Sequence, residues 1–90
     1  MAELRAGASH IVLVDTSAPE GSWAVPPVAG GRNVDHIALR VESSNEAALR
    51  AHLAAHGIAI VEERLEDGPE GSRRSFYVRD PAGNTVELMT

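Results

Sequence analysis

The chain contains no cysteine among its 90 residues, and only 3% of them are aromatic. The absence of cysteine excludes disulfides and thiolate metal sites, so any bound metal has to be held by His, Asp or Glu. The scarcity of aromatic residues leaves Ala, Val, Ile and Leu to build the core. Such a core is thin for a lone domain of this length, so association with a partner is an expectation to test.

Two further absences narrow the class of protein. The formal net charge is −5, which does not fit the concentrated basic face that a phosphate backbone requires. The first residues lack the apolar run of a signal peptide, and no segment approaches the length of a membrane span. We therefore expect a soluble, cytoplasmic protein that binds neither nucleic acid nor membrane.

Composition divides the first third of the chain into two regions. Residues 1–15 contain the turn-like Ala6-Gly7-Ala8 and then a β-branched run over residues 10–14, which predicts a short strand. Residues 16–33 are rich in Pro, Gly, Ser and Ala. This composition predicts a linker, and loops of such length usually have a function or join two modules.

Local signals in residues 34–90 predict one module with the element order β-α-β-β-β. The helix is expected to start after Ser43, which forms a capping box with Glu46, and to run to about His56, because Gly57 is suited to a left-handed stop. Alternating side chains and turn sequences predict strands over residues 34–41, 58–66, 73–80 and 85–89. The expected class is α+β, a mixed sheet with one packed helix.

Alternation along the strands assigns side chains to two faces of the predicted sheet. One face is expected to pack against Leu49 and Leu53 of the helix. This face carries Ile37, Leu39, Phe76, Val78, Val86 and Leu88. The opposite face is expected to display His36, Arg40, Tyr77, Arg79 and Glu87. Imidazole and carboxylate together suit Zn, Fe, Ni or Mn. The same pattern also fits the solvated polar face of a two-layer sheet, so both interpretations stay open at this point.

Two motifs placed around the helix carry a resemblance to a known family. They are Val34-Asp35-His36-Ile37-Ala38-Leu39 and Phe76-Tyr77-Val78-Arg79-Asp80-Pro81-Ala82-Gly83-Asn84-Thr85-Val86-Glu87-Leu88. With them, residues 34–90 resemble the second module of the vicinal oxygen chelate superfamily, which includes glyoxalases, bleomycin-resistance proteins and extradiol dioxygenases. In that family two such modules form a cleft, and each supplies one metal ligand from its first strand and one from its fourth. The resemblance implies that His36 and Glu87 bind a divalent metal, Zn, Ni, Fe or Mn.

Residues 1–15 resemble the last strands of a preceding module, which makes the chain short at its N-terminus relative to the family. The fourth-strand carboxylate of that module would fall at Val12, a side chain that cannot bind a metal. His10 faces the same side as Val12, so we expect it to line the cavity or to substitute as a ligand. The chain then offers only part of the usual ligand set, and we predict a homodimer whose two chains complete the cleft.

The resemblance implies a glyoxalase-like metal-dependent enzyme, of the lyase, isomerase or dioxygenase type, acting on a small molecule in a cleft between modules. Glu87 would be both a metal ligand and a catalytic base, whereas His10, Arg40 and Tyr77 would contact the substrate. One alternative is a metal-free protein of the bleomycin-resistance type that sequesters a small molecule. A second alternative is an inactive, truncated relative.

Overall fold

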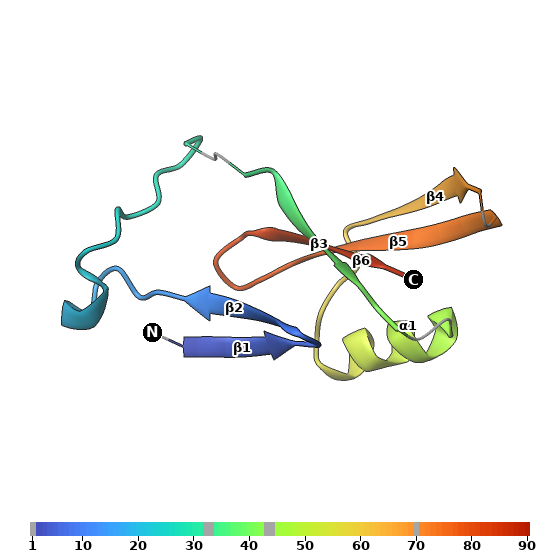
Figure 1. Ribbon diagram of the computed structural model, residues 1–90, viewed down its shortest axis with the longest axis horizontal. Coiled ribbons are helices and arrows are strands. Elements are labelled where there is room, and N and C mark those ends of the chain that lie inside the picture. The colour runs from blue at the N-terminus through green and yellow to red at the C-terminus, as the bar shows by residue number, and fades with distance from the viewer. Residues whose placement is uncertain (1, 32–33, 43–44, 70) are drawn as a thin grey trace. The chain divides into compact units, whose positions relative to one another are not determined.

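A computed structural model describes the chain except residues 1, 32–33, 43–44 and 70 and the side chains of residues 66 and 68 (Figure 1). The chain divides into two compact units, residues 1–33 and residues 34–90, and each unit is described by itself. Within these described ranges, no helix has the length and apolar character needed to cross a membrane.

The N-terminal unit begins with a hairpin of β1 (Ala2–Ala6) and β2 (Ser9–Leu13). The strands are antiparallel, with Ala6 opposite Ser9, so the turn consists of two residues. Gly7, the first of these, has a φ of +61°, the positive angle that such tight hairpin turns require. A short 3-10 helix, η1 (Pro19–Gly21), follows within the predicted linker.

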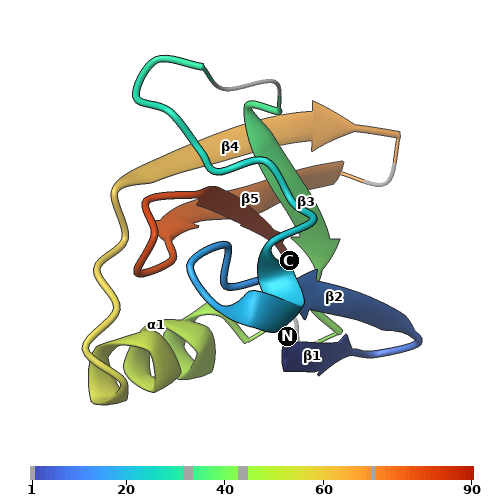
Figure 2. The same ribbon diagram turned by 90° about the vertical axis from the view of Figure 1, so that its left-hand side faces the viewer.

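The C-terminal unit, as far as it is described, is a four-stranded sheet with one helix. Its strands are β3 (His36–Arg40), β4 (Glu62–Gly68), β5 (Gly71–Arg79) and β6 (Thr85–Met89), and they lie in the order β3-β6-β5-β4. β3 is parallel to β6, whereas the other neighbouring pairs are antiparallel. The helix α1 (Glu46–Ala55) lies along one face of the sheet (Figure 2). This architecture confirms the predicted α+β fold with its β-α-β-β-β order and an N-terminal hairpin.

The start of α1 is capped by a residue other than the predicted one. The Asn45 side chain accepts a hydrogen bond from the backbone N–H of Ala48 at 3.0 Å. Asn45 therefore fills the N-cap position next to Glu46, the first residue of the helix. Ser43, which the sequence predicted as the cap, lies outside the described residues.

The end of α1 agrees with the predicted left-handed stop. Gly57 has a φ of +68°. The N–H of Ile58 donates to the Leu53 carbonyl at 2.9 Å, and the N–H of Gly57 donates to the Ala54 carbonyl at 3.0 Å, which together form a Schellman motif.

Two strands start later than predicted. β3 begins at His36, two residues after the predicted start, and β4 begins at Glu62, not at Ile58. The reason at β4 is that the N–H of Ile58 already bonds to the end of α1. Residues 58–61 then carry the chain from the helix to the edge of the sheet.

The centre of the core is the aromatic residue Phe76, which was predicted to face the helix among aliphatic neighbours. Phe76 is fully buried, with 0% exposure, and Leu53 of α1 and Val78 of β5 are also buried. Phe76 lies on β5, an inner strand of the sheet. Ile37, which was predicted to lie beneath the helix, is 45% exposed, because it belongs to the edge strand β3.

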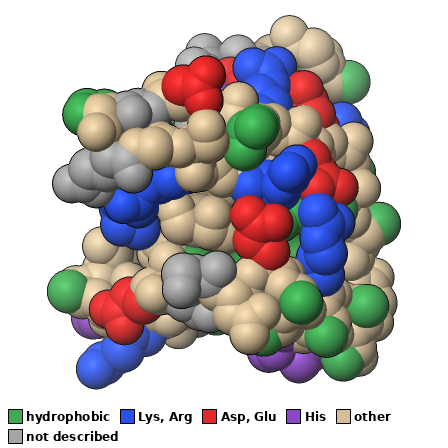
Figure 3. All heavy atoms as spheres, turned by 90° about the vertical axis from the view of Figure 1, so that its right-hand side faces the viewer, with side chains coloured by type: hydrophobic (Ala, Val, Ile, Leu, Met, Phe, Trp, Pro, Cys, Tyr) green, Lys and Arg blue, Asp and Glu red, His purple; other side chains and the backbone are tan. Residues whose placement is uncertain are grey.

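Charged side chains connect α1 to β4 and β5. Both terminal nitrogens of Arg50 on α1 donate to the Glu63 carboxylate on β4, and the Arg50 guanidinium lies 4.8 Å from the centre of the Phe76 ring. Arg74 Nε on β5 lies 3.3 Å from Glu46 Oε2 on α1. Acidic and basic side chains are interspersed on the side of the molecule where α1 and the β4–β5 hairpin lie (Figure 3).

Candidate functional site

The face of the sheet opposite α1, here called the free face, carries the predicted site residues of the C-terminal unit. Glu87 on β6 is the register partner of both Ala38 on β3 and Tyr77 on β5, and His36 is the partner of Thr85. Neighbouring residues of adjacent strands point to the same side, and side chains alternate along each strand. His36, Tyr77 and Glu87 therefore share the free face, as their alternation predicted.

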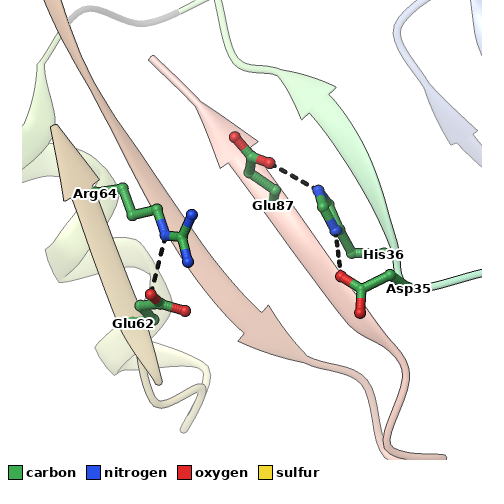
Figure 4. Close-up of polar contacts among 5 residues, drawn as sticks. All are labelled: Asp35, His36, Glu62, Arg64 and Glu87. Carbon is green, nitrogen blue, oxygen red and sulfur yellow. Dashed lines mark hydrogen bonds and ion pairs between the residues drawn. The ribbon is translucent and has the colours of Figure 1, made fainter. Parts of the chain in front are cut away.

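His36 lies between two carboxylates at the beginning of β3 (Figure 4). Its Nε2 is 3.0 Å from Glu87 Oε1, and its Nδ1 is 2.8 Å from Asp35 Oδ2. An ionised carboxylate only accepts hydrogen bonds, so both contacts favour a ring that carries protons on both nitrogens. The pKa of His36 is accordingly raised, chiefly by the hydrogen bond to Asp35, against a lowering by burial.

Glu87 is the most deeply buried acidic group of the site, with 5% exposure. Burial by itself raises the pKa of its carboxyl group, but hydrogen bonds from Ser75, Tyr77 and His36 outweigh it and hold the pKa below the usual value. Glu87 is therefore ionised at neutral pH. This is the state in which a carboxylate binds a cation or accepts a proton.

Tyr77 is buried although it points to the free face, with 8% exposure. Its ring meets the His36 ring edge to face, with 5.6 Å between the ring centres. On the β4 side the Arg64 guanidinium lies 5.7 Å from the centre of the same ring. Tyr77 thus forms the floor of the free face beside Glu87.

The remaining predicted substrate contacts have different positions. Arg40 is exposed at the end of β3. It lies four residues from His36 on the same strand, so its side chain points to the free face as well. His10 is exposed on β2 of the N-terminal unit, opposite Arg5 in the hairpin. A substrate-binding role of His10 stays a prediction.

Three residues of the site were not predicted from the sequence. Asp35 contacts His36, Ser75 donates to Glu87, and Arg64 lies over Tyr77. Only Ser75 could have been found from the sequence pattern, because it lies two residues from Tyr77 on the same strand and therefore points to the same face. Asp35 and Arg64 act through side-chain geometry that alternation does not encode.

The spacing of His36 and Glu87 is that of two neighbouring ligands of one divalent ion. Ligand atoms about 2.1 Å from an ion and at right angles to each other lie roughly 3 Å apart, and the Nε2–Oε1 distance is 3.0 Å. A carboxylate on the other ring nitrogen, as Asp35 provides, is the usual outer partner of a metal-binding histidine. Across the described ranges, no group of three or more His, Asp or Glu residues is arranged to hold a metal. The described chain thus brings together two side chains of the metal-binding type, with Asp35 at the other nitrogen of the histidine.

A scan against protein families matches residues 1–88 to the glyoxalase/bleomycin resistance protein/dioxygenase superfamily. The chain belongs to this superfamily. Membership confirms the resemblance that residues 34–90 carried. The match begins at residue 1, so it also includes the N-terminal hairpin, whose sequence was predicted to resemble the same family.

A solved structure of the same fold supports the membership. The crystal structure of a virulence protein from Salmonella typhimurium matches with 27% identity and a TM-score of 0.61, over 97% of this chain and 67% of that protein. An integron cassette protein from the mobile metagenome of Vibrio cholerae matches with 29% identity and a TM-score of 0.45, over 74% of this chain and 54% of that protein. A search of curated proteins found no significant match.

Proposed function

We propose that this superfamily member is a metal-dependent enzyme of the glyoxalase-like type, a lyase, isomerase or dioxygenase that acts on a small molecule. The observation that carries the proposal is the His36–Glu87 pair, with Nε2 and Oε1 3.0 Å apart on the free face of the sheet. The buried Glu87 carboxylate lies next to an imidazole whose other nitrogen is held by Asp35, so two groups of the metal-binding type are fixed side by side. It is a suitable arrangement for binding a cation.

In this proposal, His36 and Glu87 hold a divalent ion, Zn, Ni, Fe or Mn. When bound, the ion would act as a Lewis acid toward adjacent oxygens of the substrate. Arg40 at the rim and Tyr77 at the floor would orient the substrate. A carboxylate oxygen of Glu87 would accept and return a proton, since this side chain lies at the centre of the site.

The two ligands of one chain require completion, because metal sites of enzymes commonly have at least three protein ligands. We propose that a second copy of the chain supplies the rest, with the His36–Glu87 pairs of two copies facing one ion. This arrangement leaves His36 and Glu87 as the indispensable pair.

Metal binding to the purified chain tests the proposal. Protein prepared without a metal-affinity tag is examined by elemental analysis, and the metal-stripped protein is titrated calorimetrically with Zn²⁺, Ni²⁺ and Mn²⁺. We expect stoichiometric binding by the wild type and a loss of affinity in His36→Ala and Glu87→Gln greater than the roughly tenfold to hundredfold typical of outer partners. His52→Ala is the matched control, because His52 is exposed on α1.

Failure of the wild type to bind any of these ions, or equal losses in His36→Ala and His52→Ala, would overturn the proposal. A positive result also has a structural readout. Bound metal has to change the NMR signals of the Tyr77 ring, which lies against His36.

A metal-free binding protein is the second candidate, and one observation favours it. Glu87 accepts hydrogen bonds from Ser75, Tyr77 and His36, so its charge is satisfied by the protein alone. Such a protein would hold a small molecule on the free face without changing it. The same metal titrations separate the two candidates, because a metal-free binding protein predicts no stoichiometric binding of Zn²⁺, Ni²⁺ or Mn²⁺.

A further inference from the structure

Arginine residues stand at both edges of the free face. Register partners form one row across the sheet, from Arg40 on β3 through Met89 and Ser75 to Arg64 on β4. A row of four strands spans three spacings, roughly 14 Å in all. Glu87 is two residues from Met89 on β6, so the two arginines stand at opposite edges of the face that carries its carboxylate.

Arg64 reaches from the edge strand over the neighbouring strand β5. Its guanidinium lies 5.7 Å from the centre of the Tyr77 ring, a distance at which a cation is attracted to an aromatic face. Figure 4 shows its side chain on the same side of the sheet as those of His36 and Glu87. Arg64 is thus on the same face as the candidate metal ligands, and the Tyr77 ring contacts both Arg64 and His36.

Arg64 already binds a carboxylate within the chain. Its Nε donates to Glu62 Oε1 at 3.0 Å, and both side chains are at least half exposed, at 60% and 50%. Exposed ion pairs of this kind contribute little to stability, because solvent screens them and both side chains lose freedom. A carboxylate from outside can therefore exchange with Glu62 at small cost.

We propose that Arg64, positioned over the Tyr77 ring, is a specificity-determining residue that binds a carboxylate group of the small-molecule ligand. The proposal rests on the proposed function in one respect, because it takes the His36–Glu87 pair as the place where the ligand reacts. The planar guanidinium matches a carboxylate geometrically, and the pair is strengthened because both groups are charged. Glu62 occupies the position of the ligand carboxylate when no ligand is bound. The free face then selects carboxylates over neutral molecules of the same shape.

The test compares benzoate with benzamide, which have nearly the same shape and differ in charge. Metal-stripped protein is titrated with each compound while the ring signals of Tyr77, the only tyrosine, are followed by NMR. We expect benzoate to bind about tenfold more tightly than benzamide, and Arg64→Gln to weaken benzoate alone by about tenfold, the loss of one charge-assisted hydrogen bond. Glu62→Gln removes the internal competitor and should strengthen benzoate binding severalfold.

Arg73→Gln is the matched control for the change in net charge. Arg73 lies on β5 four residues from Tyr77, roughly 13 Å along the strand. We expect benzoate binding to change by less than about twofold in this variant. Arg64→Lys keeps the charge but not the planar guanidinium, and it replaces Arg64→Gln in the test if that variant fails to fold. We expect its affinity for benzoate to lie between those of the wild type and Arg64→Gln.

Equal binding of benzoate and benzamide, or equal losses in Arg64→Gln and Arg73→Gln, would overturn the inference. Metal binding is measured on the same samples, so the two proposals fail separately. A chain that binds no metal but shows Arg64-dependent benzoate binding contradicts only the proposed enzyme. A chain that binds metal but does not distinguish the Arg64 variants contradicts only the carboxylate subsite.

Discussion

At the scale of single residues, the site depends on an imidazole held between two carboxylates. Asp35 contacts one nitrogen of His36, and Glu87 contacts the other. The two carboxylates differ in environment, because the Asp35 side chain is 89% exposed and the Glu87 side chain 7% exposed. Asp35 therefore orients the ring from solvent, whereas Glu87 faces it from the interior.

Asp35→Asn should lower the pKa of His36, because the hydrogen bond to Asp35 is the largest cause of its upward shift. The measurement is an NMR titration of the His36 ring in the metal-stripped wild type and variant. A raised folded-state pKa means that this contact stabilises the fold fully below about pH 6.5, the usual histidine value. The contribution is then lost as the pH rises through the folded-state pKa.

A control for this prediction is Asp67→Asn, which removes a charge on β4 without touching His36. The NMR titration should give this variant the same His36 pKa as the wild type. An unchanged His36 pKa in Asp35→Asn would contradict the assigned contact. The ring nitrogen shifts of the same spectra report directly which nitrogen is protonated.

The residue scale also shows how far sequence patterns lead. Alternation predicted correctly that His36, Tyr77 and Glu87 share one face. It missed Asp35, because successive residues of a regular strand point to opposite faces. Asp35 escapes that rule since it precedes the first residue of β3.

At the scale of secondary structure elements, α1 is attached to the sheet largely by charged side chains. Arg50 bonds Glu63 on β4 and covers the ring of Phe76, the one fully buried residue in the part of the chain that the structure describes. The helix is built mainly of alanine and brings only two large apolar residues, Leu49 and Leu53. The Arg50–Glu63 pair thus closes the core where larger apolar side chains are lacking.

Glu63→Gln should reduce the free energy of unfolding at pH 7, and the difference from the wild type should shrink in acid. The pKa of Glu63 is lowered, chiefly by its hydrogen bond to Arg50. A lowered folded-state pKa gives stability that is present above the usual value of 4.5 and is lost as the pH falls through the folded-state pKa. Urea unfolding at a series of pH values measures this dependence.

Glu62→Gln is the control at this scale, because it makes the same charge change on the same strand in an exposed pair on the free face. We expect its effect on unfolding to be close to zero. A Glu63→Gln difference that is independent of pH would contradict the electrostatic attachment of α1.

At the scale of the whole molecule, the match with the Salmonella virulence protein covers 97% of this chain but 67% of that protein. Its N-terminal unit contains a two-stranded hairpin with exposed apolar residues, Leu4 at 48% and Leu13 at 45%. An isolated two-stranded hairpin has marginal stability in water, and an unpaired apolar edge invites association.

We therefore predict that the chain is a dimer in solution. Size exclusion with light scattering should give twice the chain mass of 9.5 kDa. Leu4→Glu combined with Leu13→Glu should shift the protein to monomer, because the charges disrupt an apolar contact. A matched substitution in the linker, Val25→Glu, changes a side chain that is already 89% exposed and should leave the dimer intact. A monodisperse wild-type monomer would contradict this prediction.

The family, the order of elements in residues 34–90 and the face shared by His36 and Glu87 follow from the sequence alone. These features are local, because caps, turn residues and alternation act within a few neighbouring positions. The place of β6 between β3 and β5 is a property of the tertiary fold, and it brings Glu87 to 3.0 Å from His36 although the two are 51 positions apart in the chain. The contacts of Arg50 with Glu63 and of Arg64 with Tyr77 also depend on the tertiary fold, because long side chains reach across elements whose neighbours are set by strand order.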